Sequence, residues 1–236
     1  MKTVPSDTID QVTNVLYEVD NLDTAPSNLQ RTVDYLLDAV GNRTSVPFVY
    51  DARNRCVKRN VNGVPTFFYW DNWDLIEERN GLDQQIARYV HGAMMDEILV
   101  RITADPPIYY HQDSIGSVTH LTDGNGNVVE KYTYDIFGAP TILDPQSSIL
   151  SASAFGNRFL FTGREYISEI GLYDYRNRVY SPEWGRFLQT DSLRFDAGDY
   201  NLYRYCANNP INRIHYHPIA DKIKGFPFLS QRGAGC

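Results

Sequence analysis

The sequence predicts an all-β protein made of short strands joined by many tight turns. Its aromatic content is high, with 17 Tyr and 11 Phe against only 3 Met, and tyrosine and phenylalanine suit the pleated, half-buried surface of a sheet. The 16 Gly and 12 Pro are scattered along the chain, which is typical of turns between strands and argues against disorder. A motif of tyrosine and aspartate also recurs along the chain, as repeated hairpins would require.

Overall charge and the N-terminal residues limit the classes of partner. A net charge of −7 and a pI near 5.2 give no sign of the basic patch from which nucleic-acid recognition starts, so we expect no nucleic-acid partner. No window approaches the roughly 18 apolar residues of a membrane span. Residues 1–20 contain Pro5 and several acidic residues and lack the apolar run of a secretory signal. We therefore expect synthesis in the cytoplasm, with export by a specialised secretion system left open.

The cysteines argue against a disulfide framework. Cys56, Cys206 and Cys236 are odd in number and irregularly spaced, which also speaks against a four-ligand zinc site. We expect three unpaired thiols, no metal and no cofactor.

Residues 1–48 form the first segment of the chain. Within it, the stretch from about 28 to 40 carries apolar residues at the spacing of a helix. These residues are Leu29, Val33, Leu36, Leu37 and Val40. We expect one short helix there, and the residues from Tyr35 to Arg43 also form a degenerate copy of the motif described next.

Residues 49–154, the second segment, carry a repeat in which tyrosine is followed within three residues by aspartate and then by turn-forming residues. The copies begin at Tyr50, Tyr69, Tyr110 and Tyr134. Their starts lie 19, 41 and 24 residues apart, so a unit of about 20 residues with one eroded copy fits the spacing. A unit of that length holds two strands and two turns.

An Asp-x-x-Gly pattern in these copies predicts a turn for a physical reason. Aspartate bonds its own backbone, and glycine takes positive φ freely. The strongest hairpin signal in the chain is the pair of β-rich runs 118–122 and 128–134, which flank a turn from Asp123 to Asn127.

Calcium binding is the alternative for that turn, because Asp123, Asn125 and Asn127 alternate like the start of an EF-hand loop. The rest of the pattern fails. Val128 and Tyr134 stand where that loop needs glycine and a bidentate glutamate, so we expect no calcium here.

The third segment, residues 155–218, is denser in aromatics and glycine, and residues 219–236 form a tail that we expect to be frayed. Further short strands are predicted at 171–180, 184–188 and 201–206. We interpret the many tyrosine and arginine residues here as core and cross-strand packing and not as ligand contacts.

A family resemblance becomes specific in this third segment. Its motifs are Phe161-Thr162-Gly163-Arg164-Glu165-Tyr166, Gly171-Leu172-Tyr173 with Tyr175-Arg176, Tyr180-Ser181-Pro182 with Gly185-Arg186-Phe187, and Asn201-Leu202-Tyr203 with Asn208-Asn209-Pro210. Residues 155–214 resemble the Rhs repeat-associated core, and residues 110–140 resemble the hairpin that precedes it. With the weaker tyrosine and aspartate (YD) units, the resemblance to Rhs/YD-repeat proteins covers about residues 32–214.

The resemblance implies a long β-hairpin ribbon that spirals into a hollow shell with a C-terminal core plug. In bacterial proteins of this kind, including toxin-complex C subunits, the shell encloses a variable C-terminal toxin. The core releases that toxin by aspartyl self-cleavage. The implied partners are the remainder of a shell and such a toxin.

Self-cleavage of this type needs two carboxylates that share a proton. The resemblance places the first at Asp191, whereas His215 stands in the second position and Tyr216 in the place of the following proline. We therefore expect no enzymatic activity, with Asp191 as the lone catalytic candidate. His215 and His217, with Asp221 nearby, suggest a metal pair as an alternative, but no third His or Cys stands at a useful spacing.

Three functions remain open from the sequence. The first is a structural, encapsulating shell module, truncated and without its own toxin. The second is an active aspartyl autoprotease core that releases a C-terminal peptide, and the third is a cell-surface adhesion or carbohydrate-binding domain. A partial shell would also expose unpaired strand edges, through which the chain would associate with itself.

Overall fold

The computed structural model describes residues 31–37, 43–53, 55–61, 63–191, 200–211 and 213, with side chains from Phe48 onward. Within this part of the chain, no helix is long and apolar enough to cross a membrane.

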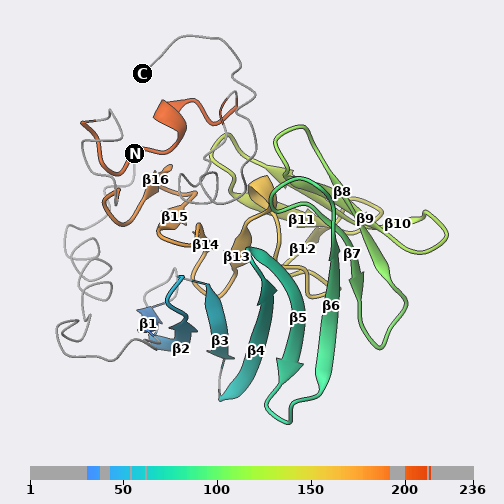
Figure 1. The fold of residues 1–236 in the computed structure, drawn as a ribbon. Coiled ribbons are helices and arrows are strands. Elements are labelled where there is room, and N and C mark those ends of the chain that lie inside the picture. The colour runs from blue at the N-terminus through green and yellow to red at the C-terminus, as the bar shows by residue number, and fades with distance from the viewer. Residues whose placement is uncertain are drawn as a thin grey trace.

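Twelve consecutive strands form one antiparallel sheet, in which the order in space follows the order in sequence (Figure 1). They are β1 (Arg31–Leu37), β2 (Arg43–Tyr50), β3 (Cys56–Val61), β4 (Val64–Asp71), β5 (Asp74–Asn80), β6 (Gln85–His91), β7 (Ile98–Ile102), β8 (Ile108–Gln112), β9 (Val118–Thr122), β10 (Val128–Tyr134), β11 (Pro140–Leu143) and β12 (Ile149–Leu150). Each strand pairs with its neighbours in sequence, and β1 and β12 are the two ends of this order. The predicted all-β hairpin ribbon is therefore confirmed.

The helix predicted near residues 28–40 is wrong, because residues 31–37 form strand β1. β1 pairs antiparallel with β2, with Val33 opposite Phe48 and Tyr35 opposite Val46. Apolar residues in so short a run fit both the helical and the strand period. The β-branched residues Thr32 and Val33 favour a strand. Pairing with a neighbouring strand decides between the two.

The predicted aspartate turns are confirmed, and they share one geometry. The backbone N–H of the first residue donates to the carbonyl four residues later, in the turns that begin at Asp51, Asn80, Asp113, Asp123, Asp135 and Asp144. In the turn between β9 and β10, the Asp123 carboxylate accepts the backbone N–H groups of Asn125 and Asn127, both at 2.9 Å. Gly126 has a φ of +81°, which is why this turn requires glycine.

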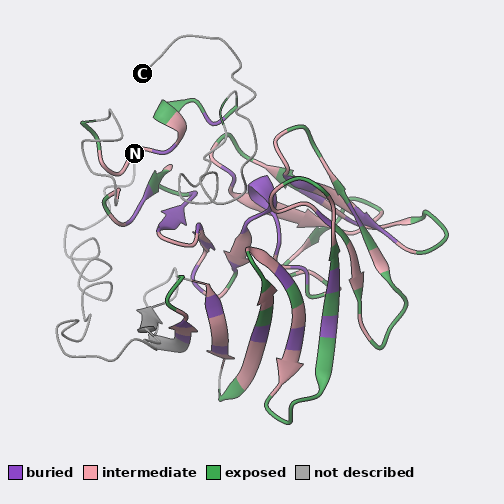
Figure 2. Ribbon diagram, in the orientation of Figure 1, coloured by how far each residue is buried: buried purple, intermediate pink, exposed green. Residues whose placement is uncertain are grey.

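One aromatic side chain per hairpin points to the inner face of the sheet. These residues are Tyr50, Phe68, Tyr89, Tyr110 and Tyr132, all at most 7% exposed and spaced by 18 to 22 residues. The eroded copy of the repeat therefore begins at Tyr89, midway in the 41-residue gap. Figure 2 shows buried and exposed positions alternating along strands such as β6, as expected for a sheet with one covered face.

A second, four-stranded antiparallel sheet consists of β13 (Glu165–Ile167), β14 (Leu172–Asp174), β15 (Val179–Ser181) and β16 (Arg186–Phe187). The single strand predicted over 171–180 is instead a hairpin, because Arg176 takes a φ of +68° and turns the chain. The strand predicted over 201–206 is not formed. Arg204 makes an isolated bridge to Arg186, and the chain then turns in a short 3-10 helix, η3 (Cys206–Asn208).

The large sheet curls around the segment that follows β12. Figure 1 shows β13 and the 3-10 turn η1 (Phe161–Gly163) on the inner side of the curve. Val118 donates its N–H to the carbonyl of Leu160 at 3.1 Å, and Tyr89 packs edge-on against Phe159. The inner face of the sheet is therefore covered by the chain's own later residues.

Candidate functional site

The candidate site is the junction between the inner face of the large sheet and residues 157–176, which we call the core segment. Two hydrogen bonds across the junction and one within the core segment show how closely the two meet. Tyr110 on β8 donates to Asn157 at 3.1 Å, and the N–H of Thr162 donates to the hydroxyl of Ser117 at 3.0 Å. Thr162 in turn shares a hydrogen bond of 2.9 Å with the hydroxyl of Tyr175.

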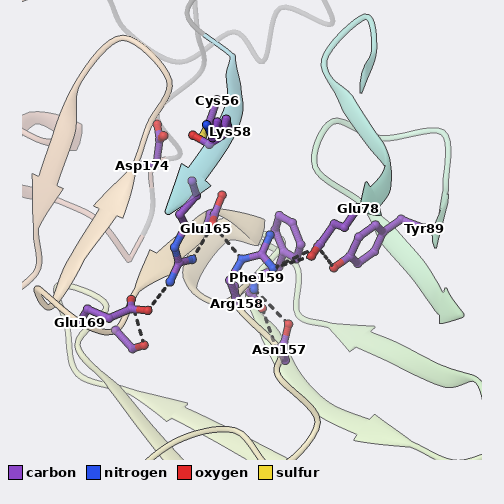
Figure 3. Close-up of polar contacts among 12 residues, drawn as sticks. Cys56, Lys58, Glu78, Tyr89, Asn157, Arg158, Phe159, Glu165, Glu169 and Asp174 are labelled. Carbon is purple, nitrogen blue, oxygen red and sulfur yellow. Dashed lines mark hydrogen bonds and ion pairs between the residues drawn. The ribbon is translucent and has the colours of Figure 1, made fainter. Parts of the chain in front are cut away.

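Arg158 lies at the centre of the junction (Figure 3). One of its terminal nitrogens lies 3.0 and 3.1 Å from the two carboxylate oxygens of Glu78 on β5, and its Nε donates to Glu165 at 2.8 Å. The guanidinium also lies over the rings of Phe68 and Phe159, at 5.2 and 5.5 Å from their centroids. One side chain thereby joins the sheet to the core segment.

Further charges complete this buried network. Arg59 on β3 pairs with Glu165 and with Glu169, and Tyr89 donates to Glu78, which is only 3% exposed. Burial opposes charge on Arg158, but Glu78 and Glu165 outweigh it and raise its pKa well above the usual range. Burial likewise opposes the charge of Glu165, yet Arg158 and Arg59 hold the pKa of Glu165 below normal. Arg158 and Glu165 are therefore both held in their charged forms.

A second ionic contact lies at the loop between β6 and β7. The Asp96 carboxylate forms ion pairs with Arg164 at 3.2 Å and with Arg176 at 2.5 Å. The guanidinium of Arg176 also lies over the ring of Trp73, at 5.0 Å from the ring centroid. Gly163 has a φ of +70°, and a Cβ there would lie 2.6 Å from the carbonyl oxygen of Asp96. Glycine is thus required for the core segment to reach this loop.

Glu130 on β10 anchors the start of the core region from the inner face. Its side chain is fully buried. The carboxylate accepts hydrogen bonds from the Ser153 hydroxyl at 2.7 Å, from the Ala154 N–H at 2.8 Å, and from Tyr132. Three donors thus fix this buried carboxylate and tie the start of the core region to β10.

An aromatic cluster fills the second sheet. Tyr175 makes edge-on contacts with Tyr180, Phe187 and Tyr205 at centroid distances of 5.5 to 5.6 Å. Tyr180 donates its hydroxyl to the carbonyl of Phe137 at 2.8 Å, and Tyr175 and Tyr205 share a hydrogen bond of 2.8 Å. Burial raises the pKa of Tyr175 to about 12, so these hydroxyls stay neutral and structural.

A cavity of about 50 Å³ lies between the sheets, lined among others by Cys56, His91 and Asp174. Cysteine, histidine and aspartate suggest nucleophilic chemistry. Burial, however, raises the pKa of the Cys56 thiol well above its usual range, which leaves it protonated and unreactive. Burial and then the nearby Glu165 raise the pKa of Asp174 to about 6.

Asp191, the predicted catalytic candidate, is not among the residues that line this cavity. Its carboxylate forms an ion pair with Arg178 at 2.9 Å, and its N–H donates to the carbonyl of Leu202 at 2.9 Å. Arg178 stacks over Phe187 at 3.7 Å. His215, His217 and Tyr216 lie outside the described residues, as does Cys236, so the second half of the predicted site is not placed.

Among the described residues, no group of three or more His, Cys, Asp or Glu side chains could hold a metal ion. Cys56 and Cys206 are unpaired thiols, as predicted. The residues of the junction that sequence reasoning missed are Glu78, Glu130 and Arg158. Glu130 carried a signal, because it lies two residues before Tyr132 on the buried side of β10, where a charge requires a partner. Glu78 lies three residues after the buried Leu75, across an irregularity in register, so simple alternation does not find it.

Comparisons with known proteins place this geometry in context, although no family model matches the chain. The chain is 30% identical over 206 residues to the tRNA3(Ser)-specific nuclease WapA of Bacillus spizizenii, which covers 79% of this chain and 9% of the relative. It is 33% identical over 198 residues to salivary gland surface protein 1 of Aedes aegypti, covering 80% of this chain and 5% of the relative. The chain thus spans less than a tenth of the length of these relatives.

A solved structure shares the fold. The chain superposes on a crystal structure of TcdB2-TccC3-Cdc42 with a TM-score of 0.57 at 21% identity, covering 79% of this chain and 9% of that one. The sequence relatives and the shared fold together support placing this chain in the Rhs-type toxin family.

Proposed function

We propose that the chain is a structural module of an Rhs-type shell, in which β1–β12 form a stretch of wall and the residues after β12 belong to the Rhs repeat-associated core. The observation that carries this proposal is the junction around Arg158. The charges at this junction are buried, paired with one another and held between the two sheets. Such an arrangement suits a structural connection between the sheets and not a catalytic site. The remainder of the shell is the main partner, and a toxin, where the protein carries one, belongs to another segment.

Strand edges supply a test of the wall. Within the described residues, β12 is the last strand of the large sheet, and Ile149 on it is 77% exposed. An unpaired edge of this kind adds strands from another chain. We expect the purified chain to associate in a concentration-dependent manner in size-exclusion chromatography with light scattering. Ile149→Lys, which places a charge on that edge, should reduce the association, with Leu82→Lys in the exposed β5–β6 turn as the matched control.

If the chain stays monomeric at every concentration tested, the proposal of an unpaired sheet edge that adds further strands is contradicted. Equal reduction by Ile149→Lys and Leu82→Lys would show that general surface charge, and not the edge, controls association.

We also propose that the chain does not cleave itself. Asp191 is engaged by Arg178 at 2.9 Å, and a coupled pair that loses one carboxylate loses most of its rate. The purified chain should keep its mass of 27.0 kDa through a long incubation between mildly acidic and neutral pH. Loss of the residues after 214, stopped by Asp191→Asn, would overturn this proposal. His215→Asp combined with Tyr216→Pro restores the first two residues of the second motif and tests whether the site can be rebuilt.

Surface binding is a second candidate, favoured by the similarity to a protein named for a salivary gland surface and by exposed aromatic side chains. Tyr69, Tyr109 and Trp184 are each 39 to 44% exposed, and exposed aromatic rings suit sugar faces. A glycan array with the purified chain distinguishes the two functions. The shell proposal predicts no bound glycan, whereas binding that is lost in Tyr109→Ala would favour the surface function.

A further inference from the structure

A second cavity, of about 370 Å³, lies beside the junction, and we call it the rim cavity. Three parts of the chain border it: residues 94–97 in the loop between β6 and β7, residues 110–116 at the end of β8 and in the turn that follows, and the core segment at Thr162 and Arg164. Its volume falls within the range of about 300–1,000 Å³ that is usual for ligand sites. The cavity between the sheets measures only about 50 Å³. The rim cavity is therefore large enough to hold a ligand group.

Hydrogen bonds hold the walls of the rim cavity together. The side-chain amide of Gln112 donates to the carbonyl of Asp96 at 3.2 Å and to the carbonyl of Gly116 at 3.0 Å, which ties the loop to the turn. The N–H of Thr162 donates to the hydroxyl of Ser117 at 3.0 Å, which ties the turn to the core segment. The three parts are thus fixed to one another, and the cavity does not depend on a single loop.

The charges around the rim cavity do not cancel. Asp96 and Arg164 form an ion pair at 3.2 Å. Arg176, the second partner of Asp96, lines the smaller cavity and not this one. Glu97 and Asp113 also line the rim cavity, and within the described part of the chain neither forms an ion pair. The cavity is therefore bordered by two uncompensated negative charges, which attract a cation.

Each of these two carboxylates uses one oxygen inside its own loop. Oε2 of Glu97 accepts the N–H of Met94 at 2.9 Å. Oδ1 of Asp113 accepts the N–H groups of Ile115 and Ser117 at 3.0 and 2.8 Å. These bonds fix both carboxylates, and the second oxygen of each accepts no hydrogen bond from the residues that the structure describes. One oxygen of each carboxylate is thus left for a donor on a ligand.

Apolar side chains form much of the remaining lining, namely Met94, Met95, Leu99 and Ile115. Met94 is 67% exposed and Leu99 is 40% exposed, and the flexible methionine side chain adapts to ligands of different shape. A hydrated metal ion gains nothing from such a surface. An ammonium group on an alkyl chain does, because the chain covers apolar surface while the charged end meets the carboxylates.

We propose that the rim cavity binds an aliphatic ammonium group, with its alkyl chain against the methionine and leucine side chains and its charged end at Glu97 and Asp113. Ammonium carries three donors and no acceptor, which suits acceptor oxygens on two different carboxylates. A guanidinium instead favours both oxygens of one carboxylate. Free polyamines and the lysine side chain of a partner segment share this chemistry. The proposal does not rest on the shell function.

Methionine methyl groups report on the rim cavity directly. The chain contains 3 Met, of which Met94 and Met95 line the cavity, and the third is Met1. The chain is labelled with ¹³C at the methionine methyl groups and titrated in the NMR spectrometer with spermidine or with a capped tripeptide that has a central lysine. The salt concentration is about 0.15 M, which screens loosely held surface ions. The control peptide carries norleucine, which has an alkyl chain of similar length without the ammonium.

Spermidine, the lysine peptide or both should shift the signals of Met94 and Met95 and leave Met1 unchanged, and the norleucine peptide should shift none. The probe that binds more tightly identifies the source of the ammonium. Glu97→Gln and Asp113→Asn each remove one charge and keep the oxygen that accepts the loop N–H groups, so each should weaken binding at least threefold. Asp123→Asn is the matched control. Asp123 makes the same turn contacts at the other end of β9 but does not line the cavity, so its loss should leave the affinity unchanged.

Three results overturn the site. The first is that neither amine shifts the signals of Met94 and Met95 at millimolar concentration. The second is equal binding of the lysine and norleucine peptides, which would make the cavity a purely apolar site. The third is equal weakening by Asp113→Asn and Asp123→Asn, which would show that the overall negative charge and not the cavity attracts the amine. Glu97→Gln and Asp113→Asn lie in different loops, so a folding defect in one leaves the other as the test.

Discussion

The large sheet and the core segment are held by different kinds of contact. In the sheet each strand pairs with its neighbours in sequence, and each aspartate turn is closed by groups within five consecutive residues. The core segment depends on partners far away in the chain. Arg158 meets Glu78, which lies 80 residues earlier, and Glu165 meets Arg59, which lies 106 residues earlier.

This difference teaches where each region is vulnerable. A sheet built from local hairpins distributes its stability over many similar contacts, as repeat proteins do. The core segment relies on a few buried charges, and a buried charge that loses its partner costs far more than an exposed one. Changes at the junction should therefore be severe, and equivalent changes on the outer face should be mild.

The largest effect is expected for Arg158→Met. It leaves Glu78 buried without its guanidinium, which should lower the free energy of unfolding by about 3–5 kcal/mol. The matched control is Arg88→Met on the outer face, where the arginine is 62% exposed and lies 3.9 Å from Glu77; we expect a change of about 0–1 kcal/mol there. Urea denaturation measures both. Adding Glu78→Gln to Arg158→Met should recover part of the loss, and a further loss would contradict the charge argument.

Gly138→Ala should have the next largest effect. Gly138 has a φ of +88°, and a Cβ there would lie 2.4 Å from the ring of Phe161. Backbone strain and crowding together should cost about 2–4 kcal/mol. Gly126→Ala is the matched control, because Gly126 has a φ of +81° and a Cβ there meets no atom within 4 Å. Equal stability of the two variants by thermal denaturation would show that the core does not press on this turn.

A pH effect is expected from Asp174, which lies 3.2 Å from the Tyr50 hydroxyl and is paired with Glu165 across the strands. Its pKa of about 6 in the folded chain exceeds the unfolded value of 3.8, so the folded state binds the proton more tightly. Its contribution to stability should therefore rise as the pH falls from 7 toward 4, by at most about 3 kcal/mol. The pKa of Glu165 is lowered from its usual value of 4.5. Glu165 therefore reduces the stability of the folded chain on acidification, but only below about pH 4.5.

The measurement for Asp174 is the free energy of unfolding at pH 7, 6 and 5, compared between the native chain and Asp174→Asn. The difference between the two chains should change with pH in that window in favour of the native chain at the lower pH. A difference that stays constant from pH 7 to 5 would contradict the raised pKa.

The smallest effect is expected from calcium at the turn between β9 and β10. The Asp123 carboxylate is already bonded by the side chain and backbone of Asn127 and by the backbone of Asn125. We expect no measurable change in melting temperature on calcium titration. A ligand that binds only the folded state must stabilise it, so a rise of several degrees that Asp123→Ala abolishes would disprove this prediction.

Local features of the sequence were sufficient for much of the large sheet. The turns followed from aspartate and glycine at fixed offsets, because those residues carry their own hydrogen bonds and backbone preferences. The hairpin over 118–134 followed from the same chemistry with β-branched flanks. The ribbon and the repeat length were thus determined by the sequence alone.

Other features were decided only by tertiary structure. Residues 31–37 fit the period of a helix until a neighbouring strand paired with them, and Arg176 turned a seemingly continuous strand into a hairpin. The partners of Arg158, Glu130 and Asp96 could not be read from spacing, because a buried charge shows that it needs a partner but not which one. Distances of 80 residues and more along the chain are closed by the curl of the sheet, and only the folded chain brings those groups together.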